Sequence, residues 1–321
     1  MSHVVGISVY SSQNTSGISV NPPQSAPDSQ ALMCLKQNAI LLFFSGISFM
    51  ICWTGILVYL TIRENEPVHW FLLSFLIKNM ILLPVQFFLG YGVLHWQWIV
   101  GYTRKVIHVG FFLLPFLLDI CLPLPEKSQW VWALWNGNLI CWMLVGMTKP
   151  VRKKLGFARL MYAAVDRPED RGLTQVYTLV QVPLSLIIIV GFTILLDIVD
   201  RQYWTLCPII AVTFGDGLAE PVAVYWKRNK ICGGTHTYRT RGLCSGSRRF
   251  ERSIEGSTTV FLFTGLAVGV IANDMSIKEC GILLGILPLT MTLLEMIAPH
   301  SMDNPFLLFW GYVVLFFVYF V

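Results

Sequence analysis

Long apolar runs repeat along most of this chain, and they restrict its fold more than any other feature. They lie near 39–62, 70–94, 106–124, 129–148, 173–199, 203–226, 257–273, 277–298 and 305–321. A helix needs roughly 20 mostly apolar residues to cross a bilayer. Only 13% of the 321 residues are charged, against about a quarter in an average soluble domain. The sequence therefore predicts an all-α, polytopic membrane helix bundle of about nine transmembrane helices.

Lysine and arginine are concentrated in three of the segments between these runs. These basic segments lie at 104–105, 149–172 and 227–256, and two predicted crossings separate each from the next. All three must then lie on one side of the membrane, which the positive-inside rule identifies as the cytosolic side. The N-terminus is expected in the cytosol and the C-terminus across the membrane.

Two carboxylates interrupt the sixth apolar run, within GDGLAEPV at 215–222. An ionised carboxylate in an apolar segment costs several kcal/mol unless it is paired or binds a metal, so Asp216 and Glu220 are candidate functional groups. At i and i+4 they share a helical face, where Mg²⁺ or an arginine would neutralise them. The alternative is an ion pair with a neighbouring helix that only stabilises packing. Gly215 and Gly217 would let backbone approach a ligand.

The segment 227–256 combines arginines with glycines and hydroxyl groups. Backbone N–H groups at glycines can converge on an anion, and the forked donors of arginine suit phosphate oxygens. Ser253 and Gly256 resemble a helix start, where free N–H groups attract phosphate. Contact with anionic lipid headgroups is the alternative. The residues predicted to bind a nucleoside triphosphate are Gly215, Gly217, Arg239, Arg241, Arg248, Arg249, Ser253, Gly256, Ser257 and Asn304.

Further polar residues fall on the same predicted side of the membrane. Arg104 and His108 lie one helical turn apart, so both could point into one site. Glu295 and Asp303 flank the last cytosolic turn, and Glu169 lies in the second basic segment. Asp303 could instead cap the last helix.

The sequence lacks the cysteine and glycine motifs of several common disulfide, zinc and nucleotide sites. The eight cysteines include no CxxC pair, so no disulfide framework is expected. Cys232, His236 and Cys244 form the nearest metal pattern, but they lack a fourth ligand for zinc. The sequence contains neither a Walker loop nor a dinucleotide fingerprint.

The order of the polar motifs resembles that of the polyprenol kinase group, which includes phytol, farnesol and dolichol kinases and the CTP-dependent diacylglycerol kinases. The resemblance covers roughly 100–310. It rests on RKVIH at 104–108, Glu169-x-Arg171-Gly172, GDGLAEPV at 215–222, RSIEGS at 252–257, and Glu295 followed by Asp303-Asn304. The family usually has glycine where this chain has Ala223, which leaves the nucleotide open.

This resemblance implies transfer of the γ-phosphate of CTP, or of another nucleoside triphosphate, to the hydroxyl of a membrane alcohol such as phytol, farnesol, dolichol or diacylglycerol. We assign catalysis to Asp216, Glu220, Glu255 and Asp303, with Asp216, Glu255 and Asp303 as candidate Mg²⁺ ligands. A cytidylyltransferase that makes CDP-diacylglycerol and a transporter with intramembrane carboxylates are the alternatives. No nucleic-acid partner is expected.

The chain is thus expected to have three parts. Residues 1–33 are predicted to form a disordered tail, because they cannot bury enough apolar surface. Residues 34–100 would form the first transmembrane helices, and residues 101–321 a catalytic transmembrane domain. The endoplasmic reticulum is the expected location, with the plastid envelope and the bacterial inner membrane as alternatives.

Overall fold

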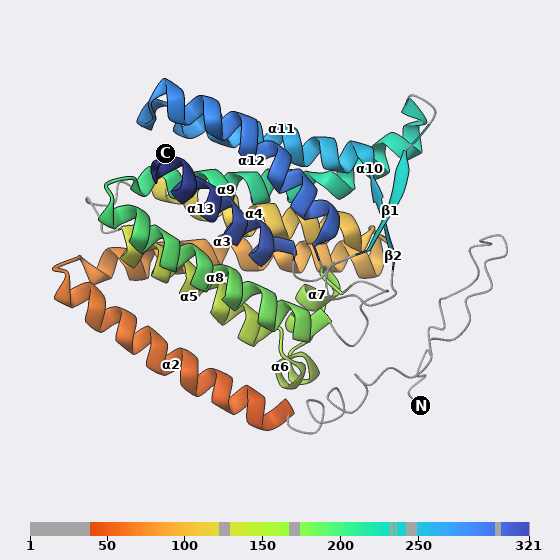
Figure 1. Cartoon of the computed structure of the whole chain (residues 1–321). Coiled ribbons are helices and arrows are strands. Elements are labelled where there is room, and N and C mark those ends of the chain that lie inside the picture. The colour runs from red at the N-terminus through yellow and green to blue at the C-terminus, as the bar shows by residue number, and fades with distance from the viewer. Residues whose placement is uncertain are drawn as a thin grey trace. The chain divides into compact units, whose positions relative to one another are not determined.

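The described part of the chain is built almost entirely of helices (Figure 1). The computed structural model describes residues 39–121, 129–166, 174–231, 234, 236–241, 249–298 and 303–320. The helices are α2 (Ala39–Arg63), α3 (Val68–His95), α4 (Val100–Cys121), α5 (Gln129–Gly146), α6 (Lys149–Lys154), α7 (Gly156–Ala163), α8 (Thr174–Ile198), η1 (Gln202–Thr205), α9 (Leu206–Ile210), η2 (Ala211–Asp216), α10 (Gly217–Asn229), α11 (Ile254–Ile271), η4 (Ala272–Asp274), α12 (Ile277–Ile297) and α13 (Asp303–Phe320). The strands are β1 (Thr237–Arg241) and β2 (Arg249–Ser253).

A helix lies on each predicted apolar run. Among the described residues, six helical stretches are long and apolar enough to cross a membrane: Val68–His95, Val180–Ile198, Gln202–Asn229, Ile254–Asp274, Ile277–Ile297 and Asp303–Phe320. Backbone groups in hydrocarbon must be satisfied within the segment, and a helix does this. The prediction of a multi-pass helical membrane bundle is confirmed, and the predicted tail, 1–33, lies outside the described residues.

Successive long helices run in opposite directions, so the described parts of the basic segments lie at one end of the bundle (Figure 1). Figure 1 shows α6, α7 and the β-hairpin at this end, together with the start of α4. We call it the basic end. The short turn between α11 and α12 lies at the other end, where Ser276 and Glu279 form a capping box at the start of α12.

The third basic segment contains a β-hairpin, which the sequence analysis did not predict. β1 and β2 pair antiparallel, with Tyr238 opposite Arg252 and Arg239 opposite Glu251. Thr and Tyr in β1 and Phe in β2 are residue types that favour strands, and successive side chains of a strand point to opposite faces. Arg239 and Glu251 are exposed, whereas Tyr238 and Arg252 are partly buried. This small hairpin is an addition to a bundle that is otherwise helical, as the all-α prediction requires.

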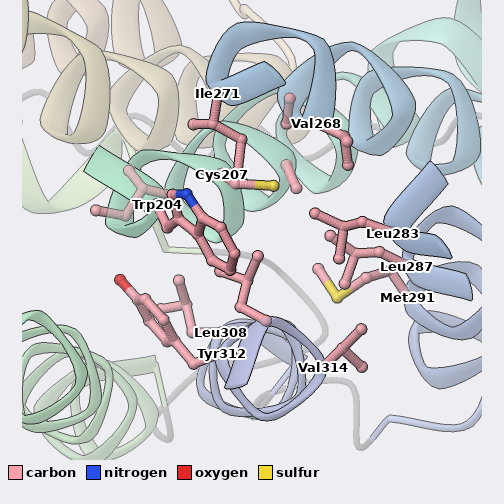
Figure 2. Close-up of a cluster of buried hydrophobic side chains, with 14 of the residues drawn as sticks. Trp204, Cys207, Val268, Ile271, Leu283, Leu287, Met291, Leu308, Tyr312 and Val314 are labelled. Carbon is pink, nitrogen blue, oxygen red and sulfur yellow. The ribbon is translucent and has the colours of Figure 1, made fainter. Parts of the chain in front are cut away.

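The largest apolar core among the described residues joins α8, η1, α9, η2, α11, α12 and α13. Figure 2 shows Trp204 and Cys207 facing Ile271, Leu287 and other side chains of the neighbouring helices. Because this core fixes η2 and α13 against each other, it also fixes the polar residues that they carry at the basic end.

Helix α3 packs closely against α7 at Gly90. A Cβ atom at this position would stand 1.8 Å from the carbonyl oxygen of Leu160. Only glycine allows the two helices to approach so closely.

We predict that Gly90→Ala lowers the stability of the purified protein in detergent. The backbone of α7 would have to move, and overpacking of this kind costs about 1–3 kcal/mol. Thermal unfolding of the two proteins measures the difference. Gly191→Ala is the matched control, because a Cβ at Gly191 meets nothing within 4 Å; equal losses in both variants would contradict the close contact.

Candidate active site

A buried ion pair joins α4 to η2. Lys105 Nζ lies 2.8 Å from Asp216 Oδ2 and also donates a hydrogen bond of 2.8 Å to the backbone oxygen of Asp216. Lys105 is 7% exposed and Asp216 is 6% exposed. Asp216 therefore forms an ion pair with a neighbouring helix, which was the alternative to binding a metal. Lys105 neutralises the charge of Asp216 at the basic end.

His108 follows Lys105 by one helical turn and borders the same carboxylate. Its Nε2 lies 3.9 Å from Asp216 Oδ2 and 3.3 Å from the carbonyl oxygen of Val212. Because a carbonyl oxygen only accepts, this hydrogen bond requires a proton on Nε2. Asp216 ends the π-helical stretch η2, a widened helix form that is frequent at functional sites.

The hairpin brings a second ion pair to the basic end. Arg252 in β2 forms a salt bridge with Glu295 near the end of α12, and its Nη2 donates to the carbonyl oxygen of Ala298 at 3.3 Å. The register places Tyr238 beside Arg252, and the Tyr238 hydroxyl lies 2.5 Å from Ser257 Oγ. Burial raises the pKa of Tyr238, so its hydroxyl stays protonated at neutral pH.

Asp303 at the start of α13 adds a third acidic group. Its Oδ1 accepts hydrogen bonds from Gln181 Nε2 in α8 at 3.1 Å and from the backbone N–H of Asn304 at 3.0 Å. Asp303 is 7% exposed. These bonds fix the carboxylate where α8 and α13 meet.

The three acidic groups form one charge cluster. Glu295 is close enough to Asp216, Asp303 and Lys105 to interact with them electrostatically. We use the name charge cluster for these four residues together with Arg252. Desolvated ions interact strongly because the surrounding dielectric constant is low, so each charge in the cluster influences the others.

A cavity of about 130 Å³ lies beside the charge cluster. Helices α4, α5 and α8 provide most of its lining, and Asn304 of α13 completes the polar part. Arg104 and His108 both line it, as their spacing predicted. The cavity is therefore a candidate binding site within reach of the charges.

Several predicted residues lie around the cluster rather than in it. Glu220 packs against Gly101 of α4, because its Oε1 lies 2.5 Å from the position that a Cβ atom of Gly101 would occupy. A Cβ at Gly215 would stand 3.3 Å from Val260 Cα, and one at Gly217 would stand 2.8 Å from Val109 Cγ2. Both glycines thus permit close helix packing, and their binding of a nucleotide stays a prediction.

The start of α11 uses its polar residues locally. Ser253 Oγ accepts a hydrogen bond of 3.0 Å from Gly256 N–H, which caps the helix. Glu255 Oε1 accepts from the backbone N–H of His236 at 2.9 Å and lies 3.0 Å from His236 Nδ1. A Cβ at Gly256 would stand 3.2 Å from the carbonyl oxygen of Ala219, so this glycine also serves packing.

The remaining predicted residues are only partly described. Arg239 is exposed on the outer face of the hairpin, and Arg241 and Arg249 lie in its strands. Glu169 and Arg248 lie outside the described residues, as do Cys232 and Cys244 of the Cys-His-Cys pattern.

The predicted Mg²⁺ ligands do not form a ready-made cage. Among the described residues, no group of three or more His, Cys, Asp and Glu side chains could hold a metal ion. Glu255 is bonded to His236, and Asp216 Oδ2 to Lys105. Binding of Mg²⁺ by Asp216 and Asp303 stays a prediction; an ion that enters with a nucleotide needs only one or two protein carboxylates, because phosphates and water supply its other ligands.

Sequence reasoning did not assign Lys105, Arg252, Gln181 or Ser185 to the site. A helical stripe was nonetheless readable in α8, where Thr174, Thr178, Gln181 and Ser185 recur at i, i+4, i+7 and i+11. Such spacing puts them on one face, and all four line the cavity. The partner of Asp216 had no comparable sequence signal, because it is separated by 111 positions.

The fold and its charge cluster define a multi-pass helical membrane protein with a polar site at one end of the bundle. No protein-family model, curated protein or solved structure matches the chain.

We predict that Lys105→Met destabilises the protein in detergent by about 3–5 kcal/mol, because it leaves Asp216 buried without its cation. Thermal and denaturant unfolding would measure the loss. The double variant Lys105→Met/Asp216→Leu should recover much of it, since neither charge then remains. A single variant as stable as the parent would show that the pair does not form.

Proposed function

We propose that this protein is a membrane kinase with nine crossings and a cytosolic N-terminus, which transfers the γ-phosphate of CTP or another nucleoside triphosphate to the hydroxyl of a lipid alcohol. Its main support is the position of the charge cluster. Three carboxylates, a lysine and an arginine meet at the basic end, directly beside a largely apolar cavity. The endoplasmic reticulum membrane remains the proposed location.

Phosphoryl transfer depends on positioning and on neutralising charge. Lys105, Arg104 and Arg252 would supply cations on the bundle side of the site. Arg239 on the exposed face of the hairpin would bind the nucleotide from the aqueous side, with Arg241 and Arg249 in the same strands. Arginine suits this function because its planar fork matches phosphate oxygens.

A carboxylate of the cluster would prepare the acceptor alcohol. Asp303 or Asp216 takes the hydroxyl proton, the alcohol oxygen bonds to the γ-phosphorus, and the bond from that phosphorus to the bridging oxygen breaks. The nucleoside diphosphate then leaves. Asp303 is the better-placed candidate for the base, because its partner Gln181 lines the cavity. The carboxylate of this pair that does not act as the base would hold Mg²⁺, which neutralises further charge on the phosphates when it is bound.

A cytidylyltransferase would need the same charges, but it breaks a different bond of the nucleotide. A kinase moves the γ-phosphate to lipid, whereas a cytidylyltransferase moves the CMP part and releases pyrophosphate. A transporter with ion-binding carboxylates would move neither.

We expect the purified protein to transfer label from γ-³²P CTP, or from another γ-labelled nucleoside triphosphate, to a lipid alcohol. Label from α-³²P CTP should stay in the water-soluble products. Thin-layer separation of the lipids measures both. Labelled lipid from the α-labelled nucleotide with phosphatidate as acceptor would favour the cytidylyltransferase, and no labelled lipid from any donor with phosphatidate or with a panel of alcohols would contradict both enzymes.

Asp303→Asn should reduce turnover by about a hundredfold or more, the usual contribution of a general base. The amide oxygen can still accept from Gln181 and from Asn304 N–H, so the fold should survive. Initial rates and thermal unfolding are to be measured together. Asp274→Asn is the matched control, because Asp274 is the last residue of η4, which follows α11 at the end of the bundle remote from the hairpin (Figure 1). Near-normal turnover in Asp303→Asn would rule out this base.

A further inference from the structure

The cavity beside the charge cluster has an apolar body and a polar edge. Its apolar lining includes Phe111 and Phe112 of α4, Leu144 of α5 and Leu186 of α8. Its polar lining comes from Arg104, His108, the α8 stripe and Asn304. Such a lining suits a ligand that is apolar except at one end.

Two polar atoms in this wall are buried without a protein partner. Within the described residues, neither Ser185 Oγ nor Asn304 Oδ1 has a hydrogen-bond partner, and Ser185 is only 5% exposed. A buried polar group left unsatisfied costs about 1–3 kcal/mol, so native proteins rarely retain one without a reason. A hydroxyl can donate as well as accept, whereas a carboxamide oxygen only accepts.

The polar edge is one side chain away from two carboxylates. His108 of the cavity wall lies 3.9 Å from Asp216 Oδ2, and Gln181 of the wall donates to Asp303 Oδ1 at 3.1 Å. A group bound at this edge would therefore lie next to the proposed base. The apolar body extends from the same edge along α4, α5 and α8.

The size of the cavity limits what it can hold. Its volume is about 130 Å³, close to that of an engineered cavity of about 150 Å³ that binds benzene. A single hydrocarbon chain end fits such a space, whereas a glycerol backbone with two ester-linked chains does not.

We infer that this cavity binds the hydroxyl end of a single-chain lipid alcohol, with Ser185 and Asn304 as its hydrogen-bond partners. The assignment rests on the proposed kinase function for its biological meaning. An alcohol has an oxygen that accepts from the Ser185 hydroxyl and one O–H that donates to Asn304 Oδ1 in the bound state, before it turns to the carboxylate of the neighbouring Asp303 for proton transfer. A hydrocarbon offers neither group, and a phosphate ester lacks the donor and adds charge. Ser185 and Asn304 are thus positioning residues that select the acceptor.

The kinetic test compares variants of neighbouring α8 residues in the full-length protein. Ser185→Ala should raise KM for farnesol or phytol about five- to tenfold, the effect of one lost hydrogen bond, with KM for the nucleotide unchanged. Leu186→Trp should fill the cavity and abolish alcohol use. Ile187→Trp is the matched control, because Ile187 is 68% exposed on the same helix. Dioleoylglycerol should be a poor acceptor for the parent protein.

A binding test separates this inference from the kinase function. A photoreactive single-chain alcohol should crosslink to α8 in the parent protein without any nucleotide, and peptide mass spectrometry should locate the adduct. Excess farnesol should compete, whereas farnesyl phosphate, the matching hydrocarbon and dioleoylglycerol should not. Ser185→Ala should keep the thermal stability of the parent, because it removes an unpartnered hydroxyl, yet it should lose the stabilisation that farnesol gives the parent.

The two tests have distinct failures. Crosslinking to α8 that Leu186→Trp removes, without phosphate transfer in any assay, would support the alcohol site and overturn the kinase. Phosphate transfer with normal KM for alcohol in both Ser185→Ala and Leu186→Trp would overturn the alcohol site and leave the kinase standing. Equal competition by the phosphate, the hydrocarbon or dioleoylglycerol would also overturn the alcohol assignment.

Discussion

The ion pair between Lys105 and Asp216 is the interaction on which the arrangement of the basic end depends. Both groups are buried, and neither charge is tolerable in an apolar interior without the other. The pair fixes α4 against η2, and with it the position of His108 beside the same carboxylate. A pair of this kind adds little net stability compared with apolar packing, so its retention is better explained by a polar site than by the fold alone.

Separate helices each bring one part of the site. The large apolar core positions η2, α12 and α13, which carry Asp216, Glu295 and Asp303. The hairpin then adds Arg252 from outside the bundle. The charged residues are therefore positioned by apolar packing elsewhere along the same helices. The polar groups can stay close together because they do not have to contribute to the core.

The cavity and the charge cluster place two different environments side by side. Apolar side chains of α4, α5 and α8 line one, and desolvated charges define the other. Gln181 and His108 belong to both, because each lines the cavity and contacts a carboxylate. Chemistry between a lipid and a water-soluble phosphate donor requires such a boundary, since the two reactants come from different solvents.

The sequence by itself determined the helical membrane class, the apolar runs and the convergence of the basic segments, because bilayer thickness and charge placement act locally along the chain. It also singled out Asp216, Glu295 and Asp303 as candidates, since carboxylates are costly among apolar residues. Only the tertiary structure decided which cation each carboxylate meets, that residues 237–253 include a hairpin, and that the stripe in α8 faces a cavity. Those features depend on contacts between residues that are remote in the sequence. Side-chain packing decides these contacts, and local periodicity carries no information about them.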